Sequence, residues 1–413
     1  MNLSYLLLRC ITFPCRYLPL KALHRIGNIL GIMAFYLMRN YRKRTLSNLA
    51  LATDLHLTAK EHIHIAKKSF QNLAINCLEF PKFAYEKHLE KIVVCENPET
   101  ANAIISTGKG IIFFCGHQSN WEVLFLDGTR RMQGMAIGKP IKNRELYRWI
   151  VSIRQRFGGR IISPKNAIKE GLNGLKKGAF IGILGDQGMP DSNYSFPFLG
   201  RRAWTTTAPG LLAYKSGCPI IVATTRRISG GYRIHYSDPL WPDLNNSMEK
   251  ETIRLMNASL QLLQASIHQS PGEWLWQHNR WKQQTPKHVK KPYRKDCICI
   301  ILPQEQKDFF YIHKHLPTLK QIYPRNFLYL IVPYKYHDQP LIEVDEVIYY
   351  EHISETLLND YRFKLIFNFT PFDKIKKHYE KLSAFSVLTL QDLKKSVPFE
   401  ENLSEVFKKS LCR

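Results

Sequence analysis

A histidine and a glutamate stand where an α/β sheet would place reactive groups. His117 follows a short apolar run, 110–115, that suits a strand buried on both faces, and Glu122 comes five positions later. Ligands and active sites of open α/β sheets lie at the carboxyl ends of the strands. If the next helix begins near residue 120, Glu122 falls in its first turn and can accept the N–H of one imidazole nitrogen. The other nitrogen would then be free to act as a general base.

The spacing alone leaves a second interpretation open. The same separation of histidine and glutamate recurs from His56 and from His268, so chance accounts for some of these pairs. Only His117 lies at a predicted switch from strand to helix. On spacing and context, His117 is either a catalytic base or a hydrogen-bonded structural histidine.

Apolar runs alternate with helical patterns through the middle of the chain. The other short apolar runs are 179–184 and 219–223, and the helical patterns are 144–157, 165–177 and 205–217. Strands that alternate with helices predict an α/β domain with a mostly parallel sheet flanked by helices. We assign residues 51–286 to this domain.

The composition becomes polar and basic after Trp281, and we assign residues 287–295 to a linker. Strand-like runs at 297–303, 327–333 and 363–369 then alternate with helical patterns, which predicts a smaller C-terminal α/β domain of Rossmann-like type over residues 296–413. This part is similar in outline to half of a nucleotide-sugar glycosyltransferase, but its sequence has no glycine-rich phosphate loop. We expect it to serve in docking or in stabilisation.

The first fifty residues carry eight basic side chains and no acidic one. Their longest uncharged stretch, 26–38, is too short to span a bilayer, and a basic cluster at residues 39–44 follows it. We predict that residues 1–50 form a helical segment lying at an anionic membrane surface. A core helix with a solvated basic end is the alternative.

The whole chain carries 59 Lys and Arg against 34 Asp and Glu, a formal charge of +25. Such an excess predicts a polyanionic partner, which could be nucleic acid, anionic lipid or an acidic protein. The nine cysteines are scattered and show no zinc-site spacing, so we interpret them as free thiols in a reducing compartment and expect no metal site.

Several motifs follow one another between residues 15 and 286. They are Gly116–Glu122, Lys139–Asn143 with Arg154-x-Arg156, Gly185–Gln187 with Phe196–Gly200, Ala213–Pro219, and Pro271–Lys282. Their order and spacing resemble those of the late acyltransferases of lipid A biosynthesis, the lauroyl/myristoyl transferase family. Linked motifs over this length are far more specific than a single histidine–glutamate pair.

The resemblance implies a membrane-bound enzyme at the cytoplasmic face of the cell inner membrane. It would move a fatty acyl chain from acyl carrier protein to a hydroxyl of a 3-hydroxyacyl chain on a Kdo-bearing lipid A precursor. An acidic donor protein and an anionic glycolipid acceptor both suit the basic charge of the chain. We expect no cofactor, because a thioester supplies the driving force and the histidine–glutamate pair the base. We also expect no nucleic-acid partner, because the basic charge lies beside an apolar helix and the sequence has no nucleic-acid-binding motif.

The resemblance also assigns roles to single residues. His117 would remove the proton of the acceptor hydroxyl, while Glu122 would orient the imidazole. The substrate-binding residues that it implies are Arg154, Arg156, Asn143, Asp186, Lys139 and Arg280. Lys139 stands where arginine is common in the family, and Gly188 stands where many members have a second acid. Both departures affect the expected contacts with the acceptor.

Two alternatives stay open at this point. The glycerolipid acyltransferases share a histidine–acid motif of the same spacing, but their Glu-Gly-Thr-Arg block is missing from this sequence. A non-enzymatic basic protein that binds membranes or nucleic acid would also explain the charge.

Overall fold

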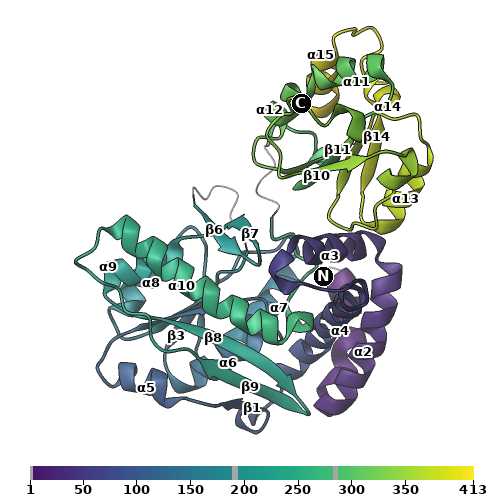
Figure 1. The fold of residues 1–413 in the computed structure, drawn as a ribbon. Helices are drawn as coiled ribbons and strands as arrows, with labels where there is room; N and C mark the ends of the chain where they lie inside the picture. Colours follow the sequence, from purple (N-terminus) through teal and green to yellow (C-terminus); the bar gives the residue numbers. More distant parts are fainter. Residues whose placement is uncertain (1–2, 188–193, 282–286) are drawn as a thin grey trace. The chain divides into compact units, whose positions relative to one another are not determined.

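The computed structural model of the chain describes residues 3–187, 194–281 and 287–413 (Figure 1). These residues form two compact units, each made of separate stretches of chain. The described residues of the first unit are 3–37, 54–187 and 194–275, and those of the second are 38–53, 276–281 and 287–413. Gly188 and Lys282, which the motif comparison singled out, lie outside the described residues.

The first unit is built on a seven-stranded sheet with the order β1-β9-β8-β2-β5-β3-β4. Neighbouring strands are parallel except for the antiparallel hairpin of β8 and β9. The strands are β1 (Val93–Cys95), β2 (Ile111–Cys115), β3 (Gly134–Ile137), β4 (Arg160–Ile162), β5 (Phe180–Leu184), β8 (Ile220–Ile228) and β9 (Gly231–Tyr236). The predicted mostly parallel sheet is therefore confirmed, and the three apolar runs are its central strands.

Helices flank this sheet, as the alternating pattern predicts. They are α4 (Ala59–Phe83), α5 (Glu99–Ile105), α6 (Glu122–Arg131), α7 (Arg144–Arg154), α8 (Ala167–Leu175), α9 (Ala208–Ser216) and α10 (Met248–Gln269). Thr58 and Glu61 form a capping box at the start of α4, so this helix begins where its backbone donors are satisfied. A two-stranded antiparallel ribbon of β6 (Ser195–Phe198) and β7 (Arg201–Trp204) was not expected from the pattern.

Two helices at the N-terminus complete the first unit, α1 (Leu3–Thr12) and α2 (Leu20–Leu37). Helix α2 lies alongside α4 (Figure 1), and the two backbones approach closely at Gly27 and Gly31, where a β-carbon would collide with α4. The outer face of α2 exposes large apolar side chains, among them Ile29 and Leu37. Among the described residues, no helix is both long and apolar enough to cross a bilayer. The interfacial position of this segment stays a prediction.

The second unit contains a five-stranded parallel sheet with the order β12-β11-β10-β13-β14. Its strands are β10 (Cys297–Ile301), β11 (Phe327–Pro333), β12 (Glu346–Tyr350), β13 (Leu365–Asn368) and β14 (Ser386–Thr389). Its helices are α11 (Gln306–His313), α12 (Leu316–Ile322), α13 (Lys374–Leu382), α14 (Leu390–Lys394) and α15 (Leu403–Leu411). Continuous apolar strands such as β10, which is buried throughout, explain why this part forms its own core.

Helix α3 (Arg39–Leu51) belongs to the second unit, although it precedes most of the first unit in the sequence. The Asn48 amide donates to the carbonyls of Trp276 at 2.9 Å and His278 at 2.6 Å. The buried Lys364 ammonium donates to Asn48 at 2.9 Å and pairs with Asp296 at 2.8 Å. The chain is therefore divided differently from the expected ranges 1–50, 51–286 and 287–295, because buried polar side chains join α3 and the residues after 275 to the C-terminal sheet.

The basic cluster of α3 was expected to face a membrane, and the structure contradicts this for Lys43, whereas Arg39 is exposed and Arg44 half-buried and for them it stays a prediction. Lys43 is buried and donates to the carbonyl of Ala384. Arg39 donates to the carbonyl of Glu380 at 3.2 Å, and Arg44 to that of Gln277 at 3.3 Å. The last carbonyls of a helix have no partner within it and attract cations. The end of α13 thus binds cations that the composition alone would place at a lipid surface.

Lys43→Met is expected to remove a pH dependence of stability. Burial, with the nearby Arg39 charge, lowers the pKa of Lys43 to about 8. An unfolded lysine has a pKa of about 10.4, so between about pH 8 and pH 10.4 the unfolded chain binds more protons and stability rises with pH. The increase amounts to about 3 kcal/mol at most. Because other groups also titrate in this range, the readout is a difference: from the lower to the higher pH, the free energy of urea unfolding should change by up to about 3 kcal/mol more in the stabilising direction in wild type, and in a Lys376→Met control whose lysine is exposed, than in Lys43→Met.

Candidate active site

The loop after β2 carries the histidine of the predicted site. β2 ends at Cys115, and His117 follows at the carboxyl edge of the sheet, where its side chain is 15% exposed. Ser119 adopts a left-handed backbone conformation with φ of 49°, which is unfavourable for a non-glycine residue. The Ser119 N–H donates to the carbonyl of Glu273 at 2.8 Å. The surrounding residues thus hold the loop in a conformation that it would not adopt alone.

Asp186 is the carboxylate that contacts the imidazole. Its Oδ1 lies 2.7 Å from Nδ1 of His117, while its Oδ2 accepts from the His117 backbone N–H and from the Trp274 indole, each at 2.8 Å. Burial alone would raise the pKa of Asp186, but the His117 ring and these hydrogen bonds lower it to about 2. Asp186 therefore stays ionised and fixes Nδ1 as the protonated nitrogen. Nε2, which lies 3.2 Å from the amide nitrogen of Gln187, is then the acceptor nitrogen, and a substrate hydroxyl must replace that contact to give it a proton.

Glu122 was expected to contact the imidazole, and the structure corrects this expectation. It forms a two-pronged ion pair with Arg154, in which Nε donates at 2.8 Å and Nη2 at 2.5 Å. Burial acts to lower the pKa of the Arg154 guanidinium, but the Glu122 carboxylate outweighs it and raises that pKa. Glu122 lies in the first turn of α6, as predicted, and from there its carboxylate meets the last residue of α7.

An apolar cavity of about 340 Å³ opens at this site. His117, Glu122, Arg154 and Lys139 line its polar end. The remaining lining is mostly aliphatic or aromatic and comes from the strands and from α6 and α7; it includes Phe113, Phe125, Ala136, Ile161, Phe180, Gly182 and Tyr236. Such a shape suits a hydrocarbon chain whose reactive end lies beside His117.

The other predicted site residues lie in different places. Asn143 caps α7 by accepting from the N–H of Leu146 at 3.1 Å, and Arg156 donates to the carbonyl of Phe83 at 2.6 Å. Arg280 is fully buried in the second unit. Among the predicted binding residues, the structure thus brings Asp186, Arg154 and Lys139 to the cavity or to His117.

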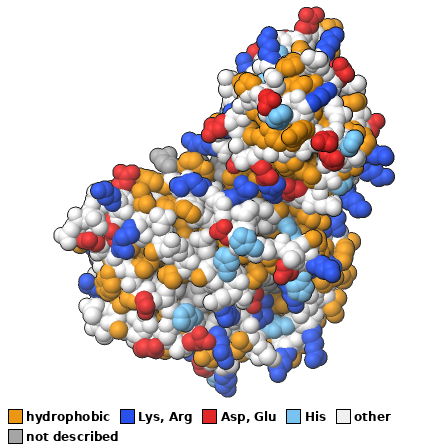
Figure 2. Space-filling view, in the orientation of Figure 1, with side chains coloured by type: hydrophobic (Ala, Val, Ile, Leu, Met, Phe, Trp, Pro, Cys, Tyr) orange, Lys and Arg blue, Asp and Glu red, His pale blue; other side chains and the backbone are white. Residues whose placement is uncertain are grey.

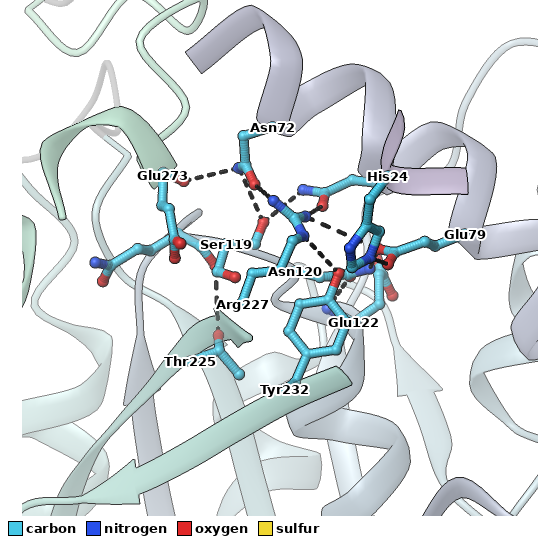
Figure 3. Close-up of polar contacts among 12 residues, drawn as sticks. His24, Asn72, Glu79, Ser119, Asn120, Glu122, Thr225, Arg227, Tyr232 and Glu273 are labelled. Atoms are coloured by element: carbon cyan, nitrogen blue, oxygen red, sulfur yellow. Dashed lines mark hydrogen bonds and ion pairs between the residues drawn. The ribbon is translucent and has the colours of Figure 1, made fainter. Parts of the chain in front are cut away.

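Behind the loop lies a buried polar network that sequence reasoning missed (Figure 3). Glu79 of α4 is fully buried; its Oε1 lies 2.6 Å from the His24 ring of α2, and its Oε2 accepts from Asn120 at 2.9 Å and from the Tyr232 hydroxyl. Asn120 in turn accepts from the backbone N–H of Glu122 at 3.2 Å. A continuous chain of contacts therefore joins α2 to the start of α6.

Arg227 of β8 forms the other half of the network (Figure 3). It donates to Asn72 and, at 2.6 Å, to Asn76, and both asparagine amides donate to the carbonyl of Ser119. Asn72, Asn76 and Glu79 lie on one face of α4 because side chains three or four positions apart are neighbours on a helix. The polar side chains at positions 72, 76 and 79, spaced as neighbours on one helix face, were the signal in the sequence that could have indicated this network.

Glu79→Gln is expected to destabilise the first unit by about 1–3 kcal/mol. Both carboxylate oxygens of Glu79 are in contact with N–H or O–H groups, and in glutamine one of these oxygens is replaced by an NH₂ group, which cannot accept a hydrogen bond. Thermal unfolding followed by circular dichroism should show a lowered midpoint. Glu99→Gln, at an exposed position in the same unit, serves as the matched control and should unfold with the wild-type midpoint. Equal midpoints for the two variants would show that the Glu79 contacts contribute nothing net.

The geometry is that of an acid–histidine pair at the mouth of an apolar cavity in an α/β fold. The sequence profile of the bacterial lipid A biosynthesis acyltransferases matches residues 3–283. Two similar proteins, from Haemophilus influenzae and Shigella flexneri, are each named lipid A biosynthesis acyltransferase. The first is 26% identical over 275 residues, which cover 63% of this chain and 81% of the relative. The second is 23% identical over 277 residues, which cover 64% and 86%. The chain therefore belongs to this family of acyltransferases of lipid A biosynthesis.

Proposed function

We propose that the protein transfers a fatty acyl chain from acyl carrier protein to a hydroxyl of a 3-hydroxyacyl chain on a Kdo-bearing lipid A precursor. The observation that carries this proposal is the position of His117, which Asp186 holds at the mouth of an apolar cavity. A base beside a slot for hydrocarbon suits a reaction between a fatty acyl thioester and an alcohol. The family to which the chain belongs supports the same class of reaction.

His117 acts as general base and then as general acid in the proposed reaction. Its Nε2 takes the proton of the acceptor hydroxyl while the hydroxyl oxygen attacks the thioester carbonyl. The tetrahedral intermediate collapses, an ester bond replaces the C–S bond, and the leaving thiolate takes the proton from the imidazolium. Asp186 remains ionised throughout and stabilises the imidazolium.

Arg154 and Glu122 act as a pair in this proposal. A guanidinium at the polar end of the cavity can stabilise the oxyanion of the intermediate or bind a phosphate of the acceptor. Glu122 fixes the direction of that guanidinium through two hydrogen bonds. Its role is therefore to position Arg154, in place of the role in orienting His117 that the spacing suggests.

A direct experiment tests the proposed reaction. Purified protein is incubated with acyl carrier proteins loaded with several chain lengths and with a Kdo-bearing lipid A precursor, and the lipids are analysed by mass spectrometry. We expect one added acyl group on the precursor. Matched reactions contain acyl coenzyme A as donor or a lysophospholipid as acceptor. Transfer to the lysophospholipid alone would contradict the proposal and favour a glycerolipid acyltransferase.

We also propose that the first unit contacts the cytoplasmic face of the inner membrane through α1 and α2. Ile29 is 64% exposed and Leu37 76% exposed on α2, and Ile11 is 65% exposed on α1. Figure 2 shows apolar and basic side chains close together over the part of the first unit that contains α2. Exposed apolar groups with neighbouring cations suit an anionic bilayer surface and attract an acidic carrier protein.

Replacing Ile29, Met33 and Leu37 by serine is expected to weaken vesicle binding about a hundredfold. Each side chain contributes about 1 kcal/mol if it is partly inserted, and these contributions add. Flotation with anionic vesicles at high salt measures this apolar part, because salt screens the charges. The matched control replaces Val94, Trp241 and Leu244, which are also exposed, and should float like wild type. Unchanged flotation of the α2 variant would place the membrane contact elsewhere.

A further inference from the structure

A second apolar groove, of about 300 Å³, lies in the first unit between α1, α4 and α7. Its walls include Leu8, Leu73, Phe80, Pro81, Leu146 and Trp149. Thr12, Asn76, Asn120, Glu122 and Arg154 supply its polar groups, and the last two form the ion pair of the candidate active site. The groove is thus apolar along its walls and charged where it meets that site.

This groove and the first cavity meet at the candidate active site. Both are lined by Trp121, Glu122, Ile150 and Arg154. The Glu122–Arg154 ion pair therefore forms part of the boundary between two apolar spaces, and only the first is also lined by His117. Two spaces of similar size that share one charged boundary suit two hydrocarbon chains brought to one reaction centre.

The other side of the groove is formed by the N-terminal helix. Leu8 and Thr12 of α1 line it, while Leu7 and Ile11 of the same helix are 60% and 65% exposed. The Arg9 guanidinium lies 4.8 Å from the centre of the Trp149 ring and helps to hold α1 against α7. The helix that borders the groove is therefore also a helix with an exposed apolar side, which is the side proposed to contact lipid.

We propose that this groove binds the hydrocarbon tail of the 3-hydroxyacyl chain that accepts the new acyl group, an inference that rests on the proposed function. The reaction requires two chains at once, and the cavity beside His117 suits the chain of the donor. The acceptor hydroxyl lies near the carboxyl end of its chain, so a long tail continues beyond the reacting carbon. A tail in the second groove would reach the membrane side along α1 and keep its apolar surface out of water.

Cys77 provides a specific probe of this groove. It lies on the groove wall and its side chain is exposed, while neighbouring apolar groups raise the pKa of its thiol, so alkylation requires a mildly alkaline pH. Cys10 is the other exposed cysteine of the described part, and Cys412 is half-buried, so both are first replaced by serine. N-alkylmaleimides of increasing length then fill the groove step by step.

Two rates are measured on the alkylated protein. One is acyl transfer at varied concentrations of the lipid A precursor, and the other is slow hydrolysis of the acyl carrier protein thioester in the absence of acceptor. We expect the KM for the precursor to rise about tenfold or more with a long alkyl group, while the KM for the donor in the hydrolysis reaction does not change. A protein that also carries Cys77→Ser should show no response to the reagent.

Each outcome separates the inference from the proposed function. An unchanged precursor KM after complete alkylation would overturn the inference, and so would an equal rise in the donor KM, which would assign the groove to the donor chain. Absence of transfer before alkylation would instead contradict the proposed function. Leu8→Trp fills the groove without chemistry and should also raise the precursor KM, whereas Leu244→Trp, at an exposed position that does not line the groove, should leave it unchanged.

Discussion

Replacing His117 with alanine is expected to lower the rate of acyl transfer about 10²- to 10⁴-fold, the usual contribution of a general base. The imidazole is the group at the cavity mouth whose second nitrogen can accept a proton, because Asp186 fixes the first. Single-turnover transfer from acyl carrier protein to the precursor measures this step. The KM values should change much less, since the imidazole acts mainly in the transition state.

A control measurement must show that the His117→Ala protein is still folded. Circular dichroism should match wild type, whereas the thermal midpoint should fall, because the buried Asp186 carboxylate loses the imidazole and keeps only the His117 backbone N–H and the Trp274 indole. His268→Ala tests the specificity of the effect, since His268 has the same spacing to a glutamate but stands in the last turn of α10. A folded His117→Ala protein that kept more than about a tenth of wild-type turnover would exclude a base at this position.

Asp186→Asn is expected to lower transfer about a hundredfold or more, although it preserves size and shape. In the aspartate, Oδ2 accepts from the His117 backbone N–H and from the Trp274 indole. The asparagine oxygen must keep that position, so its NH₂ group faces Nδ1 of His117. Nδ1 then becomes the acceptor, the proton moves to Nε2, and the imidazole can no longer act as a base.

Glu122→Gln is the informative comparison for Asp186→Asn. The amide retains one oxygen for Arg154, so we expect a loss of only about tenfold. A larger loss of transfer in Glu122→Gln than in Asp186→Asn would instead indicate that Glu122 orients His117, as the spacing suggests.

A stability measurement on Asp186→Asn adds a second test. The lowered pKa of Asp186 contributes stability that is present above about pH 4 and lost as pH falls to about 2. The Asp186→Asn protein should lack this contribution.

The positions of single strands could be predicted, whereas their order across the sheet could not. The apolar runs at 110–115 and 179–184 became β2 and β5, and each is followed by a polar residue at the carboxyl edge. Whether His117 and Asp186 would meet depends on β2 and β5 being neighbours, which tertiary packing decides. The spacing from His117 to Glu122 shows that the glutamate could reach the imidazole, but it does not show that it does. In the structure the Glu122 carboxylate binds the guanidinium of Arg154 instead.

The buried network and the place of α3 illustrate the same limit. In the sequence, Glu79 and Asn76 have the pattern of the solvent-exposed side of an amphipathic helix. Their partner in the structure is Arg227 of β8, more than 140 residues later in the chain. In the sequence, Lys43 has the context of a cation at a lipid surface. In the structure it donates to the carbonyl of Ala384, just after α13 and more than 300 residues away. Charge patterns predict that a group needs a partner, but they do not identify the partner.

The interrupted path of the chain through the second unit has a consequence during synthesis. Helix α3 is complete at Leu51, but the carbonyls that accept from its buried Asn48 amide begin only at Trp276, about 225 residues later. At about 5–20 residues per second, a ribosome needs roughly 10–45 s to make that stretch. During this interval the residues of the first unit can fold, while the Asn48 amide and the Lys43 ammonium of α3 still lack the carbonyls that bind them in the finished protein. A chain that ends before residue 276 would keep α3 but lack every carbonyl that these buried side chains bind, and an unsatisfied buried polar group is costly.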